Sequence, residues 1–228
     1  MERIPLKAII SYTGRYNLKR IGFVGIDSTD IVVYVARMIN ATGKKVGIVD
    51  CSMHKSLMRT VALPEELVKG NGYYKEILIL SGETDNEADL KAQDIVLYYF
   101  ESNINHTHIA QCTDFVFVSD MVLSHAQLFQ ELSVGDVPKI MLIHNAVSVK
   151  YSEKYLITQT GQEFQKEDIL IIPYEERDFR SKCYLCIDKM HRLTKLSSAM
   201  KSVILTLFLR YMETEYTGKE LTQLLKQA

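Results

Sequence analysis

The segment from Gly25 to Asp30 stands where a phosphate-binding loop would stand, but it lacks most of the residues that hold phosphate. It reads Gly-Ile-Asp-Ser-Thr-Asp, between an apolar run expected to be a strand and a helical run. A working loop places glycines, a lysine and a hydroxyl residue at the free N–H groups of a helix N-terminus. Here one glycine is followed by two aspartates and no lysine. The aspartates would repel phosphate, so the loop argues against ATP hydrolysis.

Two interpretations of this loop stay open. Gly25, Ser28 and Thr29 could form a vestigial nucleotide site that holds a nucleotide weakly at the helix N-terminus. Alternatively, Ser28, Thr29 or Asp30 simply caps the helix, and no ligand is involved.

Other polar residues suggest metal chemistry only weakly. Carboxylates follow or end expected strands at Asp27, Asp50 and Glu101, where an active enzyme of another α/β family could bind a metal. His106, His108 and Cys112 could supply three ligands to a metal ion, but no further acidic or cysteine residue is evident that would complete the site. We therefore predict no catalytic residues and no metal site.

Cys183 and Cys186 form a C-x-x-C pair. Redox pairs of this spacing usually carry Gly or Pro between the cysteines at a helix start, and zinc sites need a second ligand pair. Neither condition is met, so the prediction is ordinary buried packing.

Composition indicates one α/β domain spanning 1–228, without a nucleic-acid partner. The chain has 228 residues, 47% of them hydrophobic, and a net charge of −1. No signal peptide or membrane-spanning run is evident, so we expect a cytoplasmic protein. The C-terminal Lys219–Lys226 is too short and too weakly amphipathic to favour membrane attachment, and a helix end docked on the domain is expected instead. Membrane association is expected only through a partner.

Apolar runs alternate with helical patterns along the chain. This order predicts an α/β fold with a doubly wound, mostly parallel β-sheet flanked by helices. The expected strands are Ala8–Tyr12, Arg20–Ile26, Val46–Asp50, Ile77–Ser81, Asp94–Phe100, Asp114–Ser119, Lys139–His144 and Asp168–Ile172. The expected helices are Thr29–Thr42, Ser52–Thr60, Thr84–Gln93, Ser124–Leu132, Ser152–Gly161 and Ser197–Glu215, the last opening a C-terminal helical region over 197–228. Residues 1–18 are either an N-terminal extension or an edge strand.

The order of elements resembles the MinD/ParA-like family of deviant Walker (SIMIBI) P-loop ATPases over roughly Arg20 to Tyr211. Thr42–Asp50 (TGKKVGIVD) resembles the family's second strand, and Asp114–Ser119 (DFVFVS) a later one. The resemblance implies that Asn145, at a strand end, faces an adenine, although an Asn also closes strand ends by itself. It likewise places Pro173 in a late nucleotide-contacting loop.

The departures from this family concern catalysis. Both loop lysines are absent, the second switch I aspartate falls at Ser52, and the switch II aspartate falls near Tyr99. Phosphoryl transfer needs a lysine and metal-holding carboxylates to neutralise developing charge. The resemblance therefore implies a degenerate, non-hydrolysing member, within which the TadZ/CpaE-like group linked to pilus or secretion assembly is the preferred subclass.

The function expected from this comparison is a pseudo-ATPase adaptor that positions or regulates a larger assembly through protein–protein contacts. No cofactor is expected, although weak ATP or ADP binding stays open. Because family dimers form across the nucleotide face, a homodimer is a further expectation. The alternative is a nucleotide-binding switch with slow or no hydrolysis. It would need a cation from outside the loop, for which Lys19, Arg20 or a partner subunit are the candidates.

Overall fold

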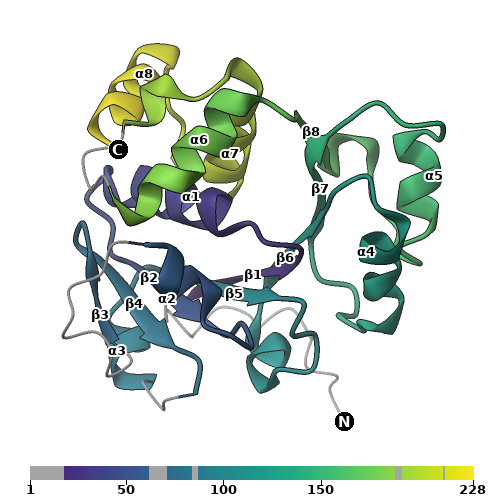
Figure 1. Cartoon of the computed structure of the whole chain (residues 1–228). Coiled ribbons are helices and arrows are strands. Elements are labelled where there is room, and N and C mark those ends of the chain that lie inside the picture. Colours follow the sequence, from purple (N-terminus) through teal and green to yellow (C-terminus); the bar gives the residue numbers. More distant parts are fainter. Residues whose placement is uncertain (1–17, 62–70, 84–86, 188–191, 213) are drawn as a thin grey trace, which may run out of the picture.

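An eight-stranded sheet with the strand order β3-β4-β2-β5-β1-β6-β7-β8 forms the centre of the computed structural model (Figure 1). The structure describes residues 18–61, 71–83, 87–187, 192–212 and 214–228. The strands are β1 (Lys19–Gly25), β2 (Val46–Asp50), β3 (Asn71–Tyr74), β4 (Ile77–Ser81), β5 (Ile95–Glu101), β6 (Asp114–Ser119), β7 (Lys139–Ala146) and β8 (Ile169–Pro173). β3 runs antiparallel to β4, and the other neighbouring pairs are parallel.

Helices connect the strands and cover both faces of the sheet. They are α1 (Thr29–Asn40), α2 (Ser56–Thr60), α3 (Glu87–Lys91), α4 (Leu123–Gln127), α5 (Glu153–Thr158), α6 (Glu176–Cys183), α7 (Ser198–Tyr211) and α8 (Gly218–Gln227). Short 3-10 helices lie at Thr107–Gln111, Leu128–Glu131, Lys166–Asp168, Tyr184–Cys186 and Leu193–Lys195.

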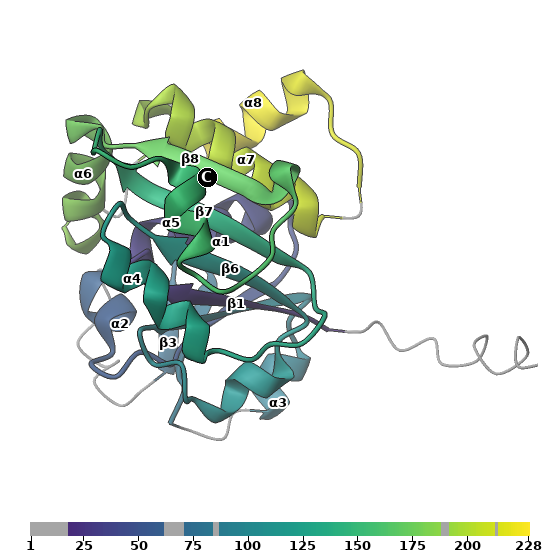
Figure 2. The ribbon, with the colours of Figure 1, turned by 90° about the vertical axis from the view of Figure 1, so that its right-hand side faces the viewer.

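The core has two parts, one on each face. On one face, buried residues of α1, α2, α7 and α8 pack on the sheet, and α1 is buried from Thr29 to Ile39. On the other face, α3, α4 and α5 contribute the buried residues. Figure 1 shows α1, α6, α7 and α8 grouped together and α4 with α5 on the opposite side, and Figure 2 shows α4 and α5 in front of the sheet. The predicted doubly wound, mostly parallel α/β fold is therefore confirmed.

Most strands have the predicted positions because their apolar runs are buried on both faces. Every residue of β2 and β4 is buried, and their bounds match the prediction. β3 was missed, because Asn71 and Gly72 are turn-type residues and the strand forms only by pairing with β4 at the sheet edge. The expected strand Ala8–Tyr12 lies outside the described residues.

Two helical expectations need correction, and one helix was not predicted. The helix expected from Ser52 begins at Ser56, because Ser52 N–H instead donates to the Asp50 carboxylate in a turn. The long C-terminal helix ends at Tyr211, where Met212 adopts extended backbone. α6 was not predicted at all, although it carries a residue that proves central to the site.

The C-terminal segment docks on the domain as expected. α8 opens with a capping box in which Thr217 and Glu220 satisfy each other's backbone N–H groups. Leu224 and Leu225 of α8 are buried in the core. Within the described ranges, no helix is both long and apolar enough to cross a membrane.

Candidate functional site

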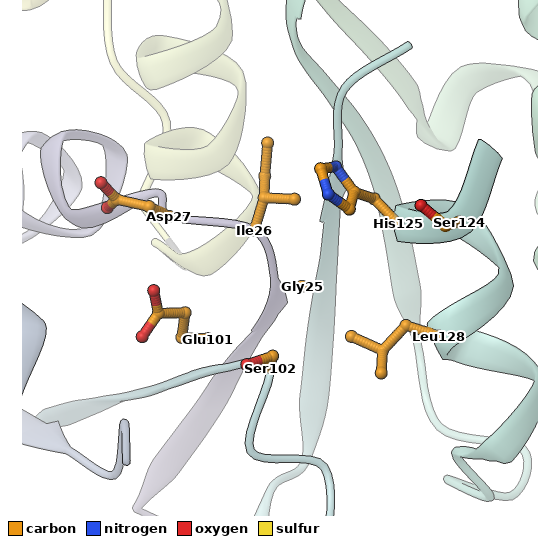
Figure 3. A pocket seen from close by; sticks show the side chains of 8 residues that line it. All are labelled: Gly25, Ile26, Asp27, Glu101, Ser102, Ser124, His125 and Leu128. Atoms are coloured by element: carbon orange, nitrogen blue, oxygen red, sulfur yellow. The ribbon is translucent and has the colours of Figure 1, made fainter. Parts of the chain in front are cut away.

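A cavity of about 530 Å³ opens at the carboxyl edge of the sheet, where β1, β5 and β6 end. Ligand sites of open α/β sheets lie outside this edge. The cavity is lined by Gly25, Ile26, Asp27, Glu101, Ser102, Ser124, His125 and Leu128. In Figure 3, Asp27 and Glu101 lie on one side of Gly25 and the α4 side chains lie on the other.

Gly25 is required by the path of the chain out of β1. Its φ is +131°, and a Cβ atom there would stand 1.9 Å from the carbonyl oxygen of Val118. Directly afterwards, Ile26 N–H donates to that same oxygen at 2.9 Å. The start of the loop is therefore pressed against β6, where no side chain fits.

The Asp27 carboxylate occupies the N-terminus of α1. Its Oδ1 accepts hydrogen bonds from Thr29 N–H at 3.1 Å, from the Thr29 hydroxyl at 3.0 Å and from the Tyr99 hydroxyl at 3.3 Å. Free N–H groups at this position are the ones that bind anions in phosphate loops. One of the two interpretations of the loop expected Ser28, Thr29 or Asp30 to cap the helix. In the structure Asp27 accepts the Thr29 N–H instead, and the Ser28 side chain makes no capping bond.

Lys182 of α6 supplies a cation to the loop. Its Nζ lies 2.9 Å from Asp27 Oδ2 and 3.8 Å from Asp30 Oδ1. Burial would lower the pKa of Lys182, but the charges of Asp30 and Asp27 outweigh it and raise the pKa. Burial would likewise raise the pKa of Asp27, yet Lys182 and the Thr29 hydrogen bonds hold that pKa below its usual value. The ammonium group of Lys182 is therefore already paired with the carboxylates of Asp27 and Asp30.

Asp30 is part of the buried wall beneath the loop. Its side chain is 2% exposed, and its Oδ2 lies 3.5 Å from Nε2 of His144, on β7. Sequence reasoning missed both Lys182 and His144. His144 lies at the end of a predicted strand and Lys182 in a helix that was not predicted, and no local pattern indicates that either side chain reaches the loop.

The carboxylates of Asp50 and Glu101 accept hydrogen bonds from residues of the loop before α2 and of α2 itself. Asp50 accepts hydrogen bonds from Ser52 N–H, from the Ser52 hydroxyl and from Met58 N–H, at 2.5 to 3.0 Å. Burial raises its pKa despite these bonds. The Ser56 hydroxyl donates to Glu101 at 2.8 Å. Within the described ranges, no group of three or more His, Cys, Asp and Glu residues is placed to hold a metal ion.

The residues proposed for a nucleotide site share one edge but do not line one cavity. Of Gly25, Ser28, Thr29, Asn145 and Pro173, only Gly25 lines it. Ser28 and Thr29 are buried in the first turn of α1. Asn145 is the next-to-last residue of β7 and has a left-handed φ of +57°, and Pro173 is the last residue of β8. Their contact with a nucleotide stays a prediction.

Two sequence expectations about other residues are wrong. Lys19 and Arg20 cannot supply the loop cation, because they lie at the opposite end of β1, where Arg20 pairs with Glu87. Cys183 and Cys186 are exposed free thiols rather than buried ones.

Comparison with known proteins bears on the fold. No family model matches the sequence, and no curated protein matches it. Among solved structures, a ParA family ATPase from Chlorobium tepidum TLS is similar, with a TM-score of 0.58 and 12% sequence identity over 85% of this chain and 98% of that chain. At this identity the likeness concerns architecture. With the sheet order and the loop ahead of α1, it shows that the chain has an α/β P-loop NTPase fold of the MinD/ParA type.

Proposed function

We propose that this protein is a non-hydrolysing pseudo-ATPase adaptor that positions or regulates a larger assembly through protein–protein contacts. The observation that carries the proposal is the Asp27 carboxylate, which accepts the Thr29 N–H at the N-terminus of α1. A bound phosphate would need that place and those donors. ATP and its magnesium ion therefore do not fit the residues present.

The charge balance supports the same conclusion. Lys182 is the lysine that pairs with the loop, with its Nζ 2.9 Å from Asp27 and 3.8 Å from Asp30. A triphosphate needs surplus positive charge, whereas this loop offers one ammonium shared between two carboxylates. Tyr99, near which the resemblance places the switch II aspartate, donates its hydroxyl to Asp27 and carries no carboxylate that would hold a metal ion.

The kind of assembly is a finer part of the proposal. Placement of a pilus, a secretion system or another cell-positioning structure, in the manner of the TadZ/CpaE-like group, rests on the resemblance and on the ParA-type fold. A homodimer has the same basis. Without a bridging nucleotide it would depend on side-chain contacts, and a light-scattering mass of 26.1 kDa at high concentration, with and without nucleotide, would exclude it.

Lys182 favours one alternative function, a nucleotide-binding switch. If Asp27 swung out of the helix N-terminus, the ammonium would be free to face a phosphate. The switch then needs a nucleotide that displaces a carboxylate from both Thr29 and Lys182.

Calorimetric titration with Mg-ATP and Mg-ADP separates the two functions, after an absorbance ratio has excluded carried-over nucleotide. We expect no binding at millimolar nucleotide; micromolar binding would make the switch the better description. Inorganic phosphate titrated into Asp27→Asn serves as a companion measurement. It should bind more tightly to that variant than to the unaltered protein, because the variant removes the competing anion.

A further inference from the structure

His106 caps the 3-10 helix Thr107–Gln111 in the connection between β5 and β6. Its ring nitrogen Nδ1 accepts a hydrogen bond from the backbone N–H of His108 at 3.2 Å. An imidazole nitrogen accepts a hydrogen bond only while it carries no proton. The cap therefore requires the neutral form of His106 with its proton on Nε2. Protonation of Nδ1 would set two N–H donors against each other.

The two histidine rings also lie against each other and against β5. The ring centroids of His106 and His108 are 5.0 Å apart, with an angle of 27° between the planes. The His106 ring lies 5.9 Å from the ring of Phe100, and the His108 ring lies 5.3 Å from the ring of Tyr98. Phe100 and Tyr98 are both buried in the core of this face. A proton on His106 would thus place a charge beside a second imidazole and on an apolar part of the sheet.

Burial and the surrounding groups favour the neutral ring. Burial is the largest cause that lowers the pKa of His106 below 6.5, and the charge of His108 adds to it. Glu83, in the loop after β4, acts in the opposite direction, but its carboxylate is paired with Lys55 at 2.8 Å. The phenol of Tyr98 stays uncharged, because burial raises its pKa to about 12.

Other ionisable groups around this helix are paired or neutral. Arg20 of β1 forms an ion pair with Glu87 of α3 at 3.3 Å and also donates to Gln111. The Cys112 thiol donates to the carbonyl oxygen of His108 at 3.5 Å, and burial raises the pKa of this thiol to about 12. His106 thus differs from these groups, because its protonation breaks a hydrogen bond of the cap.

We propose that His106 is an acid-sensitive cap, which holds the 3-10 helix Thr107–Gln111 against β5 while its ring is neutral and releases it when the ring is protonated. Release breaks the hydrogen bond from His108 N–H and lifts the two histidine rings off Phe100 and Tyr98. The inference is independent of the adaptor function, because it concerns how the chain responds to acid rather than what the chain binds.

NMR spectra of the full chain test the cap directly. A long-range proton–nitrogen spectrum should show His106 with an unprotonated Nδ1 and a protonated Nε2 at about pH 7. The folded pKa of His106 lies below 6.5, so its contribution is complete above that value and disappears as the pH falls through the folded pKa. The backbone amide signal of His108 should therefore move toward that of a free amide, with the same midpoint as the His106 ring.

The Cys112 thiol gives a second measure of release. It is 7% exposed in the structure and lies at the end of the helix that His106 caps. A dithiodipyridine reagent labels thiols in mild acid, and peptide mapping distinguishes Cys112 from the other cysteines. Relative to a free cysteine peptide at each pH, labelling of Cys112 should accelerate by about tenfold or more below the midpoint, since one hydrogen bond is lost and a charge meets an apolar surface.

Three variants assign the response to the cap. His106→Asn keeps a side-chain oxygen that can cap the helix but does not titrate, so the acid response of the His108 amide and of Cys112 should disappear. His108→Phe keeps a ring beside Tyr98 and removes the neighbouring charge, so the midpoint of His106 should rise. His125→Asn, which changes a histidine of α4, is the matched control and should leave the response unchanged.

Three results would overturn the proposal. A proton on Nδ1 of His106 at neutral pH would show that the cap does not form. A His108 amide signal that stays in place across the His106 midpoint would show that protonation leaves the helix attached. An acid response that survives in His106→Asn would assign it to another group. If His106→Asn failed to fold, the first two measurements, made on the unaltered protein, would still decide the question.

Discussion

At the residue scale, one carboxylate makes most of the contacts at the loop. Asp27 caps α1 by accepting Thr29 N–H, and it pairs with Lys182. These are the donors and the charge that a phosphate would otherwise use. The protein thus carries its own anion in the anion site, and an external anion must displace it.

The pair between Lys182 and Asp27 should contribute measurably to stability. Lys182→Met should lower the free energy of unfolding by about 2 kcal/mol, less than for a fully buried pair because Asp27 is half exposed. Lys55→Met breaks an ion pair of nearly the same length, 2.8 Å to Glu83, but that pair is exposed to water, so its loss should lower the stability much less than Lys182→Met does. Urea denaturation measures both. Equal losses for the two variants would show that the Lys182 pair has no special role.

The same pair should give a defined pH dependence. Asp27 has a folded pKa below 3.8, so its contribution is complete above that value and disappears as the pH falls through the folded pKa. Lys182 has a folded pKa above 10.5, so its contribution is complete below that value and disappears as the pH rises further. The stability difference between the protein and Lys182→Met should therefore be greatest between these limits. A difference that stays constant into acid would contradict the assignment; Asp27→Asn is the control.

At the element scale, two junctions hold the site in place. β1 passes to α1 through Gly25, pressed on β6, and α6 brings Lys182 across the sheet edge. α8 closes the other end of the chain by burying Leu224 and Leu225 against the α1 and α7 face. Each element is short, so its position depends on what it packs against rather than on its own helical propensity.

Gly25→Ala should be severely destabilising. The new Cβ would meet the Val118 carbonyl oxygen at 1.9 Å with φ at +131°, and a loss of more than about 3 kcal/mol is expected. Gly43→Ala is matched in having a positive φ, +83°, but its Cβ meets nothing within 4 Å, so its cost should be about 1 kcal/mol. Thermal unfolding of the two variants would reveal the difference. Comparable midpoints would mean that β1 can move away from β6.

Because α8 docks on the core, its buried leucines should contribute to the free energy of unfolding. Leu224→Ala should lower the free energy of unfolding by about 2 kcal/mol, because it removes a side chain that is 8% exposed from the core. Leu209→Ala, on the exposed side of α7, should cost about 0.5 kcal/mol or less. Guanidinium denaturation provides the values. If Leu224→Ala were as harmless as Leu209→Ala, α8 would not be part of the folded core.

At the scale of the whole molecule, the sheet is a rigid frame with its chemistry confined to one edge. Helices bury both faces, and the parallel strands deliver the ends of β1, β5, β6, β7 and β8 to the same side. At that edge lies the cavity whose lining includes the carboxylates of Asp27 and Glu101.

Global stability should not respond to nucleotide. A ligand bound with a Kd of about 10 μM would add about 2.7 kcal/mol at 1 mM and raise the melting temperature by several degrees. We expect a shift of less than about 1 °C with Mg-ATP or Mg-ADP. Thermal scans with the same concentration of inorganic sulfate control for general salt effects. A nucleotide-specific rise would contradict the adaptor proposal.

The sequence by itself determined the frame and which residue types stand in the loop ahead of α1. Continuous apolar runs such as Val46–Asp50 require burial on both faces, and the helical run after Gly25 is local, so both were predictable. Tertiary structure alone decided the electrostatics of the site. Lys182 reaches the Asp27 backbone carbonyl across 155 residues, and His144 meets Asp30 beneath the loop. No local pattern encodes such contacts, because they arise only when separate strands of a parallel sheet bring their ends to one edge.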